Sequence, residues 1–198
     1  EGNALRVGSA GLDFETLNTY SVGVRSTDAA GASIVRTFNI SVNNLNDAPI
    51  ASAGGPYSIG EGQPLALIGS ATDQDSGQIL TYEWDLDYDG SVFNLDASGQ
   101  SPTVVFPEQG SRTIALRVRD NGTPARESIV TATVNVSNRN PVLAVNQATV
   151  SGNVLDTFTN SGTWSDVVSD TVTLAASLGV VTKNSDGTWS WSYVPPAK

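Results

Sequence analysis

Two strand-like segments with the same ending recur in this chain and limit what it can fold into. In "RTFNISVNNLNDAP" (36–49) and "TATVNVSNRNP" (131–141), apolar residues occupy every second position before the segment closes on Asn and Pro. Period-two alternation is the pattern of a β-strand with one buried face. Proline then stops the pairing, because it cannot donate to the ladder. The chain is therefore predicted to consist of repeated β units, each ended by a short linker.

The spacing of these units indicates their size. From Pro49 to Pro141 is 141 − 49 = 92 residues, near the ~100 residues of an immunoglobulin-like β-sandwich. A second alternating run precedes each closing strand, "TYSVGVRSTD" (19–28) and "RTIALRVRDNG" (112–122), and no helical periodicity persists. We therefore predict an all-β fold, with tandem immunoglobulin-like β-sandwich modules in a linear array.

The predicted modules are 1–49, 50–140 and 141–198, of which the first and last are incomplete. Half a sandwich exposes its core and its strand edges. We expect further residues of a longer chain to complete the outer modules, or alternatively half-modules of neighbouring chains. The sequence begins without Met and has no signal peptide or long apolar run, so it is interpreted as an internal piece. Strands of the middle module are predicted near 64–71, 79–85, 102–106, 111–119 and 127–137.

Composition excludes several classes of chemistry. The chain has no Cys, His or Met, so thiol nucleophiles, Cys/His zinc sites and histidine bases are ruled out. A net charge of −10 argues against nucleic acid and anionic membranes and favours cations. Paired carboxylates occur in glycosidases, but linear sandwich modules imply no concave site. We therefore expect no enzymatic activity.

The modules also resemble known families. Module one resembles the C-terminal half of a cadherin-type repeat, through "LDFE" (12–15), "YSVGVRSTD" (20–28) and "NNLNDAP" (43–49), although Phe14 stands where Arg is usual and Asn44 where the first linker acid lies. Module two looks like a PKD-type domain, and module three resembles bacterial immunoglobulin-like repeats. The PKD-type likeness rests on "GPYSIGEGQPLALIGSATDQDSG" (55–77), "YEWDLDYDG" (82–90) and "LRVRDNG" (116–122), and that of module three on "GTWSD", "DTVTLAAS" and "DGTWSWS".

The cadherin resemblance implies calcium at the first junction. Calcium takes six to eight oxygen ligands, which linker residues and carboxylates of both neighbouring modules supply. The alternative is that these residues are solvated loop ends, where Asp and Asn are common. At the second junction "SNRNP" lacks the linker aspartate, so no strong site is expected there. Carried over by position, the first-junction ligands are Asp13, Glu15, Asn46, Asp47, Glu61, Asp73, Asp75 and Asp120.

A second acidic motif, "DLDYDGSVFNLD" (85–96), has the spacing of a helix-flanked calcium loop, with an aspartate at position twelve. The preceding "LTYEW" alternates like a strand, so we interpret Trp84 as a core residue and the acids as the strand's exit turn. Because closely spaced acids cluster oxygens whatever flanks them, Asp85, Asp87 and Asp89 form a second candidate calcium site.

An aromatic row near the C-terminus has two interpretations. Trp189, Trp191 and Tyr193 alternate on one strand face and are predicted to belong to a core. A sugar-stacking platform is the alternative, and it requires Trp189 and Trp191 to be exposed on one flat face.

The function predicted from these features is structural. We expect a non-enzymatic, calcium-rigidified extracellular repeat segment of a bacterial surface protein, serving as a stalk, adhesin or surface-layer component. The alternative is a set of spacer or polymer-binding accessory modules of a secreted hydrolase. Expected partners are the adjacent modules, with neighbouring copies or cell-surface polymers as further candidates. Neither nucleic acid nor membrane insertion is expected.

Overall fold

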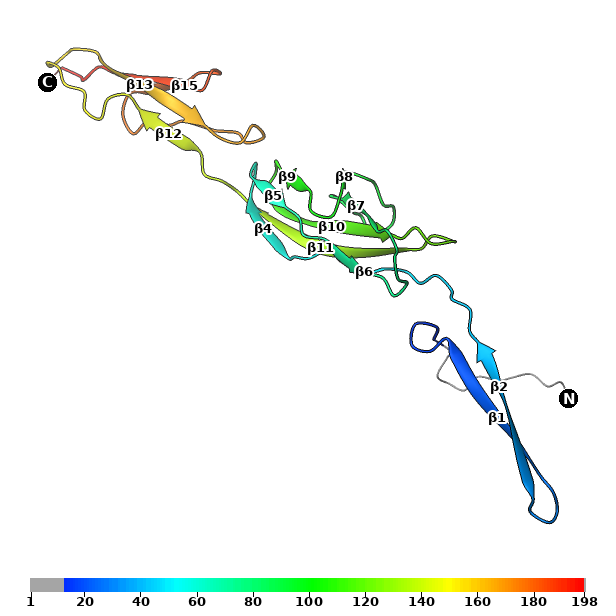
Figure 1. Ribbon diagram of the computed structural model, residues 1–198. Coiled ribbons are helices and arrows are strands. Elements are labelled where there is room, and N and C mark those ends of the chain that lie inside the picture. Colours follow the sequence, from blue (N-terminus) through cyan, green and yellow to red (C-terminus); the bar gives the residue numbers. More distant parts are fainter. Residues whose placement is uncertain (1–12, 198) are drawn as a thin grey trace.

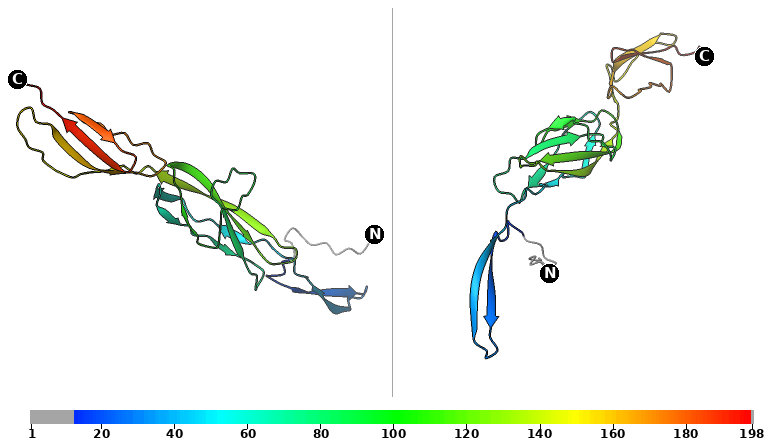
Figure 2. Two further views of the ribbon diagram at one scale, coloured as in Figure 1. Left: turned by 90° about the horizontal axis from the view of Figure 1, so that it is seen from above. Right: turned by 90° about the vertical axis from the view of Figure 1, so that its right-hand side faces the viewer.

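The computed structural model describes residues 13–197, and the regular structure of this part is entirely β-strand (Figure 1). The strands form three groups that follow one another along an elongated molecule (Figures 1 and 2). The N-terminal hairpin contains β1 (Thr19–Thr27) and β2 (Ser33–Ser41). The C-terminal sheet contains β12 (Val142–Val145), β13 (Phe158–Ser165), β14 (Val180–Lys183) and β15 (Thr188–Tyr193). The central sandwich contains β3 (Ile50–Ser52), β4 (Tyr57–Gly60), β5 (Pro64–Ala66), β6 (Ser70–Thr72), β7 (Thr81–Asp85), β8 (Ala97–Ser98), β9 (Thr103–Val105), β10 (Gly110–Arg119) and β11 (Glu127–Ser137).

The central sandwich is built around one long antiparallel pair. β10 pairs with β11 over its whole length, and both lie in a five-stranded sheet of order β4-β11-β10-β7-β8. Two short ladders, β3–β6 and β5–β9, complete the sandwich. β4 joins β11 in parallel, with Ser137 opposite Gly60. The turn that follows β4 therefore lies at the C-terminal end of β11, whereas the β10–β11 turn lies at the opposite end.

The core of the central sandwich confirms the alternation expected from the sequence. Ile114, Leu116 and Val118 on β10 are 0% exposed and pack with Val134 of β11. Trp84 of β7 is also fully buried, and its indole N–H donates to the carbonyl of Gly99 at 3.0 Å. Burial of one such aliphatic side chain stabilises a fold by about 1.5–3 kcal/mol, so this cluster holds the two layers together.

The N-terminal hairpin has an apolar face that the described residues leave open. β1 and β2 pair in antiparallel register, and Tyr20, Val22, Phe38 and Ile40 share one face with Val24. Val24 and Phe38, on the inward face of the alternating strands, are 56% and 51% exposed. They are exposed because, among residues 13–197, no second sheet covers this face.

The C-terminal sheet carries the aromatic row on β15. The strand order is β12-β13-β15-β14. Trp189 is buried, and its indole N–H donates to Ala144 O at 3.0 Å. Trp191 and Tyr193 are half-buried and stacked, with ring centroids 6.3 Å apart. The platform alternative, which needs both tryptophans exposed, does not fit the buried Trp189. The core interpretation fits Trp189, and it fits the half-buried Trp191 and Tyr193 only in part.

No segment within residues 13–197 forms a helix of the length and apolarity needed to span a membrane.

Candidate metal sites at the ends of the central sandwich

The linker between β2 and β3 is bound to the central sandwich through a buried aspartate. Asp75 lies in the loop after β6, and its carboxylate accepts the side-chain amide of Asn44 at 2.6 Å. Its other oxygen accepts the backbone N–H of Asp47 at 2.7 Å. The Asp47 N–H and the Asn44 amide hold the pKa of the Asp75 carboxyl below its usual range. Asp75 is therefore a charged group that fixes the linker's position.

A second contact involves Asn46 and the β10–β11 turn. The amide nitrogen of Asn46 donates to Asp120 Oδ2 at 2.9 Å and to the carbonyl of Pro124 at 3.0 Å, and its oxygen accepts Gln78 Nε2 at 3.0 Å. Burial opposes ionisation of Asp120, but the N–H groups of Arg126, Asn46 and Gly122 outweigh it, and its pKa lies below the usual range. The amide of Asn46 thus occupies a polar slot on the central sandwich.

The acids of the N-terminal segment lie in a turn just before β1. Asp13 caps this turn, since its carboxylate accepts the backbone N–H groups of Glu15 and Thr16 and the Thr16 hydroxyl at 2.7 Å. Burial, and then the negative charges of Asp75 and Asp47, raise the pKa of Glu15. Glu15 therefore faces the acids of the linker and of the central sandwich.

Asp73 gives the strongest sign that a ligand is missing from this junction. Its Oδ1 accepts the backbone N–H of Asp75 at 2.9 Å. Its Oδ2 is buried and finds no hydrogen-bond donor among the described residues. A buried carboxylate oxygen without a partner is costly, and a cation would satisfy it. The oxygen-only donors at this junction fit a hard cation such as calcium.

The structure places Glu61 away from this group, which corrects the expected ligand set. Glu61 follows β4, is 0% exposed, and accepts the backbone N–H groups of Gln109 at 3.1 Å and Arg139 at 2.7 Å. The parallel β4–β11 pairing carries it to the far end of β11. Ten residue steps at about 3.4 Å each put it about 34 Å from the β10–β11 turn. Of the predicted first-junction residues, Glu61 alone lies at the second junction.

At that second junction, where no strong site was expected, Glu61 lies near Asp166 and Asp170 of the loop after β13. Burial, followed by the charges of Glu61 and Asp166, raises the pKa of Asp170. The Ser169 hydroxyl donates to the carbonyl of Pro107 at 3.1 Å across the same junction. Asp166 and Asp170 could not be predicted as neighbours of Glu61, because nothing in their spacing indicates that they meet the turn after β4.

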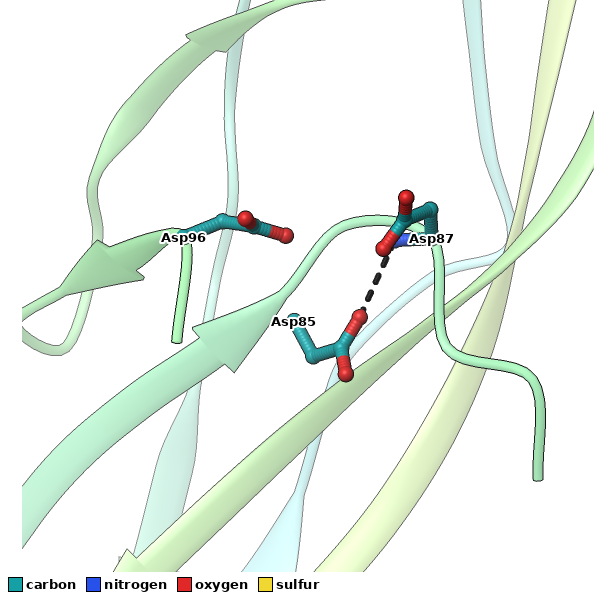
Figure 3. Close-up of side chains that lie close together, drawn as sticks. All are labelled: Asp85, Asp87 and Asp96. Carbon is teal, nitrogen blue, oxygen red and sulfur yellow. Dashed lines mark hydrogen bonds between the residues drawn. The ribbon is translucent and has the colours of Figure 1, made fainter. Parts of the chain in front are cut away.

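The acidic motif after β7 forms a cluster of a different composition from the one predicted. Asp85, Asp87 and Asp96 have carboxylate oxygens within 4.8 Å of one another, and they are the sole such acidic group found among residues 13–197 (Figure 3). Asp89 is not part of it: its carboxylate accepts the Ser91 backbone N–H and hydroxyl, both at 2.8 Å. Asp96, missed as a ligand, was signalled by its position at the end of the loop motif.

Asp85 also has a structural role in this cluster. It is 0% exposed, and it accepts the backbone N–H groups of Asp87 at 3.1 Å and Asn94 at 2.7 Å. Asp96 accepts the backbone N–H of Leu86 at 2.7 Å. Both carboxylates therefore hold the 86–96 loop in place. Among the described residues, the acids of the first junction do not bring three carboxylate oxygens within 4.8 Å of one another, as these three acids do.

Comparison with known proteins agrees with this architecture in the middle of the chain. Residues 46–136 match the family model of the PKD domain. The human dyslexia-associated protein KIAA0319 is 30% identical over 130 residues, covering 64% of this chain and 12% of that protein. Mouse protocadherin Fat 2 is 30% identical over 145 residues, covering 65% of this chain and 3% of that protein. The chain thus spans a small fraction of either relative.

Solved structures of cadherin repeats are also similar. The protocadherin gammaB7 EC3-6 cis-dimer structure is 24% identical, with a TM-score of 0.46, over 72% of this chain and 38% of that one. Mouse cadherin-23 EC22-24 is 22% identical, with a TM-score of 0.42, over 66% and 45%. These likenesses are weak and carry no functional argument. The match to the PKD model, together with the all-β structure, supports an immunoglobulin-type β-sandwich of PKD-like architecture at residues 46–136.

Proposed function

We propose that this chain is a non-enzymatic, calcium-rigidified repeat segment of an extracellular bacterial surface protein, acting as part of a stalk, adhesin or surface layer. The observation that carries the proposal is the buried, unpartnered Oδ2 of Asp73, next to the charged Asp75 in the loop that receives the linker. A carboxylate oxygen in this position needs a partner that the described residues do not provide.

Calcium fits the donors better than softer metals do. The sequence contains no Cys or His, so a cation here would be held by carboxylate, amide and carbonyl oxygens. Calcium accepts six to eight such ligands in irregular geometry, whereas magnesium demands a near-ideal octahedron. Asp73, Asp75 and Asp120 of the central sandwich would hold the ion, together with Asp47 of the linker and Glu15 before β1.

Bound calcium would act mechanically. Glu15 belongs to the N-terminal segment, and burial first and then repulsion by the negative charges of Asp75 and Asp47 raise its pKa. A divalent cation between them converts that repulsion into attraction. The hinge between the hairpin and the central sandwich would then stiffen, with the elongated arrangement of Figure 1 as the rigid form.

The proposal includes a location and partners. Extracellular calcium modules bind with dissociation constants of about 10⁻⁴–10⁻³ M, so such a site fills at extracellular calcium concentrations. Neighbouring modules, further copies of the chain and surface polymers are the partners that a spacer of this kind would meet. The PKD-like architecture of residues 46–136 supports a role as a repeat module.

A calcium titration tests the proposal. Thermal unfolding and small-angle scattering are measured in chelator and in millimolar calcium, for the wild type and for Asp73→Asn. This substitution keeps the Oδ1 acceptor for Asp75 N–H but replaces the unpartnered oxygen. We expect calcium to raise the melting temperature and narrow the distribution of end-to-end lengths in the wild type, with at least a tenfold weaker response in the variant.

The matched control is Asp89→Asn, which removes one negative charge from an exposed turn outside both junctions. It should respond to calcium as the wild type does. Identical melting and scattering curves of the wild type with calcium and with chelator would overturn the proposal.

A further inference from the structure

The linker at the first junction contains amide groups that contact buried carboxylates as a cation would. Asn44 and Asn46 each present an amide nitrogen to a buried carboxylate, at 2.6 Å from Asp75 Oδ1 and at 2.9 Å from Asp120 Oδ2. An N–H group carries a partial positive charge, and hydrogen bonds to ionised acceptors are about twice as strong as neutral ones. The two carboxylates that bind the linker are therefore partly neutralised by the chain itself.

The orientation of the Asn46 amide follows from its surroundings. Its nitrogen faces two acceptors, Asp120 Oδ2 and the carbonyl of Pro124, while its oxygen faces a donor, Gln78 Nε2. Rotating the amide by half a turn would place its oxygen against two acceptors and its nitrogen against a donor. Gly122 makes room for this side chain, because a Cβ at that position would overlap the Asn46 amide. The slot is thus shaped for an amide in one orientation.

We infer that Asn44 and Asn46 form a cation-independent latch that keeps the linker docked on the central sandwich when no calcium is bound. Every partner of the latch belongs to the central sandwich, so the latch does not restrain the N-terminal segment. Asp13 instead bonds within its own turn, to Glu15 and Thr16. The flexible point of the junction then lies before Asn44, and bound calcium would stiffen that point.

This inference rests on the proposed function only for the action of calcium, because the latch itself needs none. According to this inference the junction has two parts, a linker that stays docked without calcium and a hinge that a cation stiffens. A junction without such a latch would instead come apart completely on removal of calcium.

The backbone amide of Asp47 reports on the latch, because it donates to Asp75 Oδ2 at 2.7 Å only while the linker is docked. Its hydrogen exchange is measured in chelator and in calcium for the wild type, for Asn46→Asp and for Asn43→Asp. The Asn46→Asp variant opposes a carboxylate to Asp120 and to the Pro124 carbonyl. Asn43→Asp adds the same charge to an exposed linker position and is the matched control.

In chelator we expect a protected Asp47 amide in the wild type and in Asn43→Asp, and exchange faster by about tenfold or more in Asn46→Asp. The Leu116 amide in the buried core should stay protected in all three proteins, which shows that the sandwich remains folded. Calcium should restore protection in Asn46→Asp by neutralising the added charge.

The outcomes separate the latch from the proposed function. If the wild-type Asp47 amide exchanges freely in chelator and becomes protected only in calcium, the latch is overturned while calcium binding stands. If it is protected in chelator and calcium changes nothing in any variant, the latch stands and the calcium proposal fails. Equal exchange of Asp47 in Asn46→Asp and the wild type in chelator also overturns the latch.

Discussion

Substitution of Asp85 by Asn should reveal what the buried acid at the end of β7 contributes without any metal. Asp85 accepts two backbone N–H groups, from Asp87 and Asn94, and is fully buried. Asn offers one oxygen and one NH₂ group, so one backbone N–H of the 86–96 loop would face another donor. A hydrogen bond to a charged acceptor contributes about 1.5–3 kcal/mol, and a buried unsatisfied group costs a similar amount.

One effect opposes this loss. The carboxylates of Asp87 and Asp96 lie within 4.8 Å of that of Asp85, and removing its charge relieves their repulsion. Both neighbours are exposed, so screening limits this gain to at most about 1 kcal/mol. The net expectation for Asp85→Asn is a loss of about 1–2 kcal/mol in the free energy of unfolding.

The assay is urea unfolding in chelator, followed through the amide signals of β10 so that only the central sandwich is observed. Asp89→Asn is the control, since Asp89 is exposed and Asn also accepts the turn hydrogen bonds that Asp89 accepts from Ser91. It should change the free energy of unfolding by less than about 0.5 kcal/mol. A similarly small change for Asp85→Asn would refute the structural role. Repetition in calcium shows whether the cluster also binds an ion, because calcium should then stabilise Asp85→Asn less than it stabilises the wild type.

Three further predictions concern pH and packing. In chelator, the docking of the linker contributes stability above the ordinary carboxyl pKa of 3.8 and is lost as the pH falls below it, because the pKa of Asp75 is lowered; the exchange rate of the Asp47 amide against pH measures this. The pKa of Asp170 is raised above 3.8, so its contact with Glu61 is most stable below that pH and weakens as the pH rises through the folded-state pKa. Small-angle scattering should show the second junction loosening with rising pH in the wild type and no such change in Asp170→Asn. Leu116→Ala should reduce the free energy of unfolding by about 2–5 kcal/mol, as measured by urea unfolding, since the side chain is fully buried.

The sequence could predict the features that depend on neighbouring residues along the chain. Alternation placed Ile114 and Val118 on a buried face, and both are 0% exposed. The exit turn after Trp84 was likewise predicted, since the motif there lacks helical flanks. Such features follow from the period of the strand and from local turn preferences.

Features that depend on strand direction were predicted less well. The expectation that Glu61 joins Asp120 failed because the order of residues does not say whether β4 runs parallel or antiparallel to β11. The parallel pairing observed places Glu61 at the other end of the sandwich. Asp96 likewise entered the acidic cluster in place of Asp89 because the 86–96 loop returns to pair β8 with β7.

The sequence by itself determined an all-β chain, the inward face of its long strands and the concentration of acids near the strand ends. Tertiary structure alone decided which acids meet, that Asp73 keeps an unpartnered oxygen, and that Asn46 fits a slot beside Gly122. The physical reason is that strand period and turn chemistry are local properties of the chain. The neighbours of a carboxylate, in contrast, depend on how strands distant in sequence pair and in which direction they run.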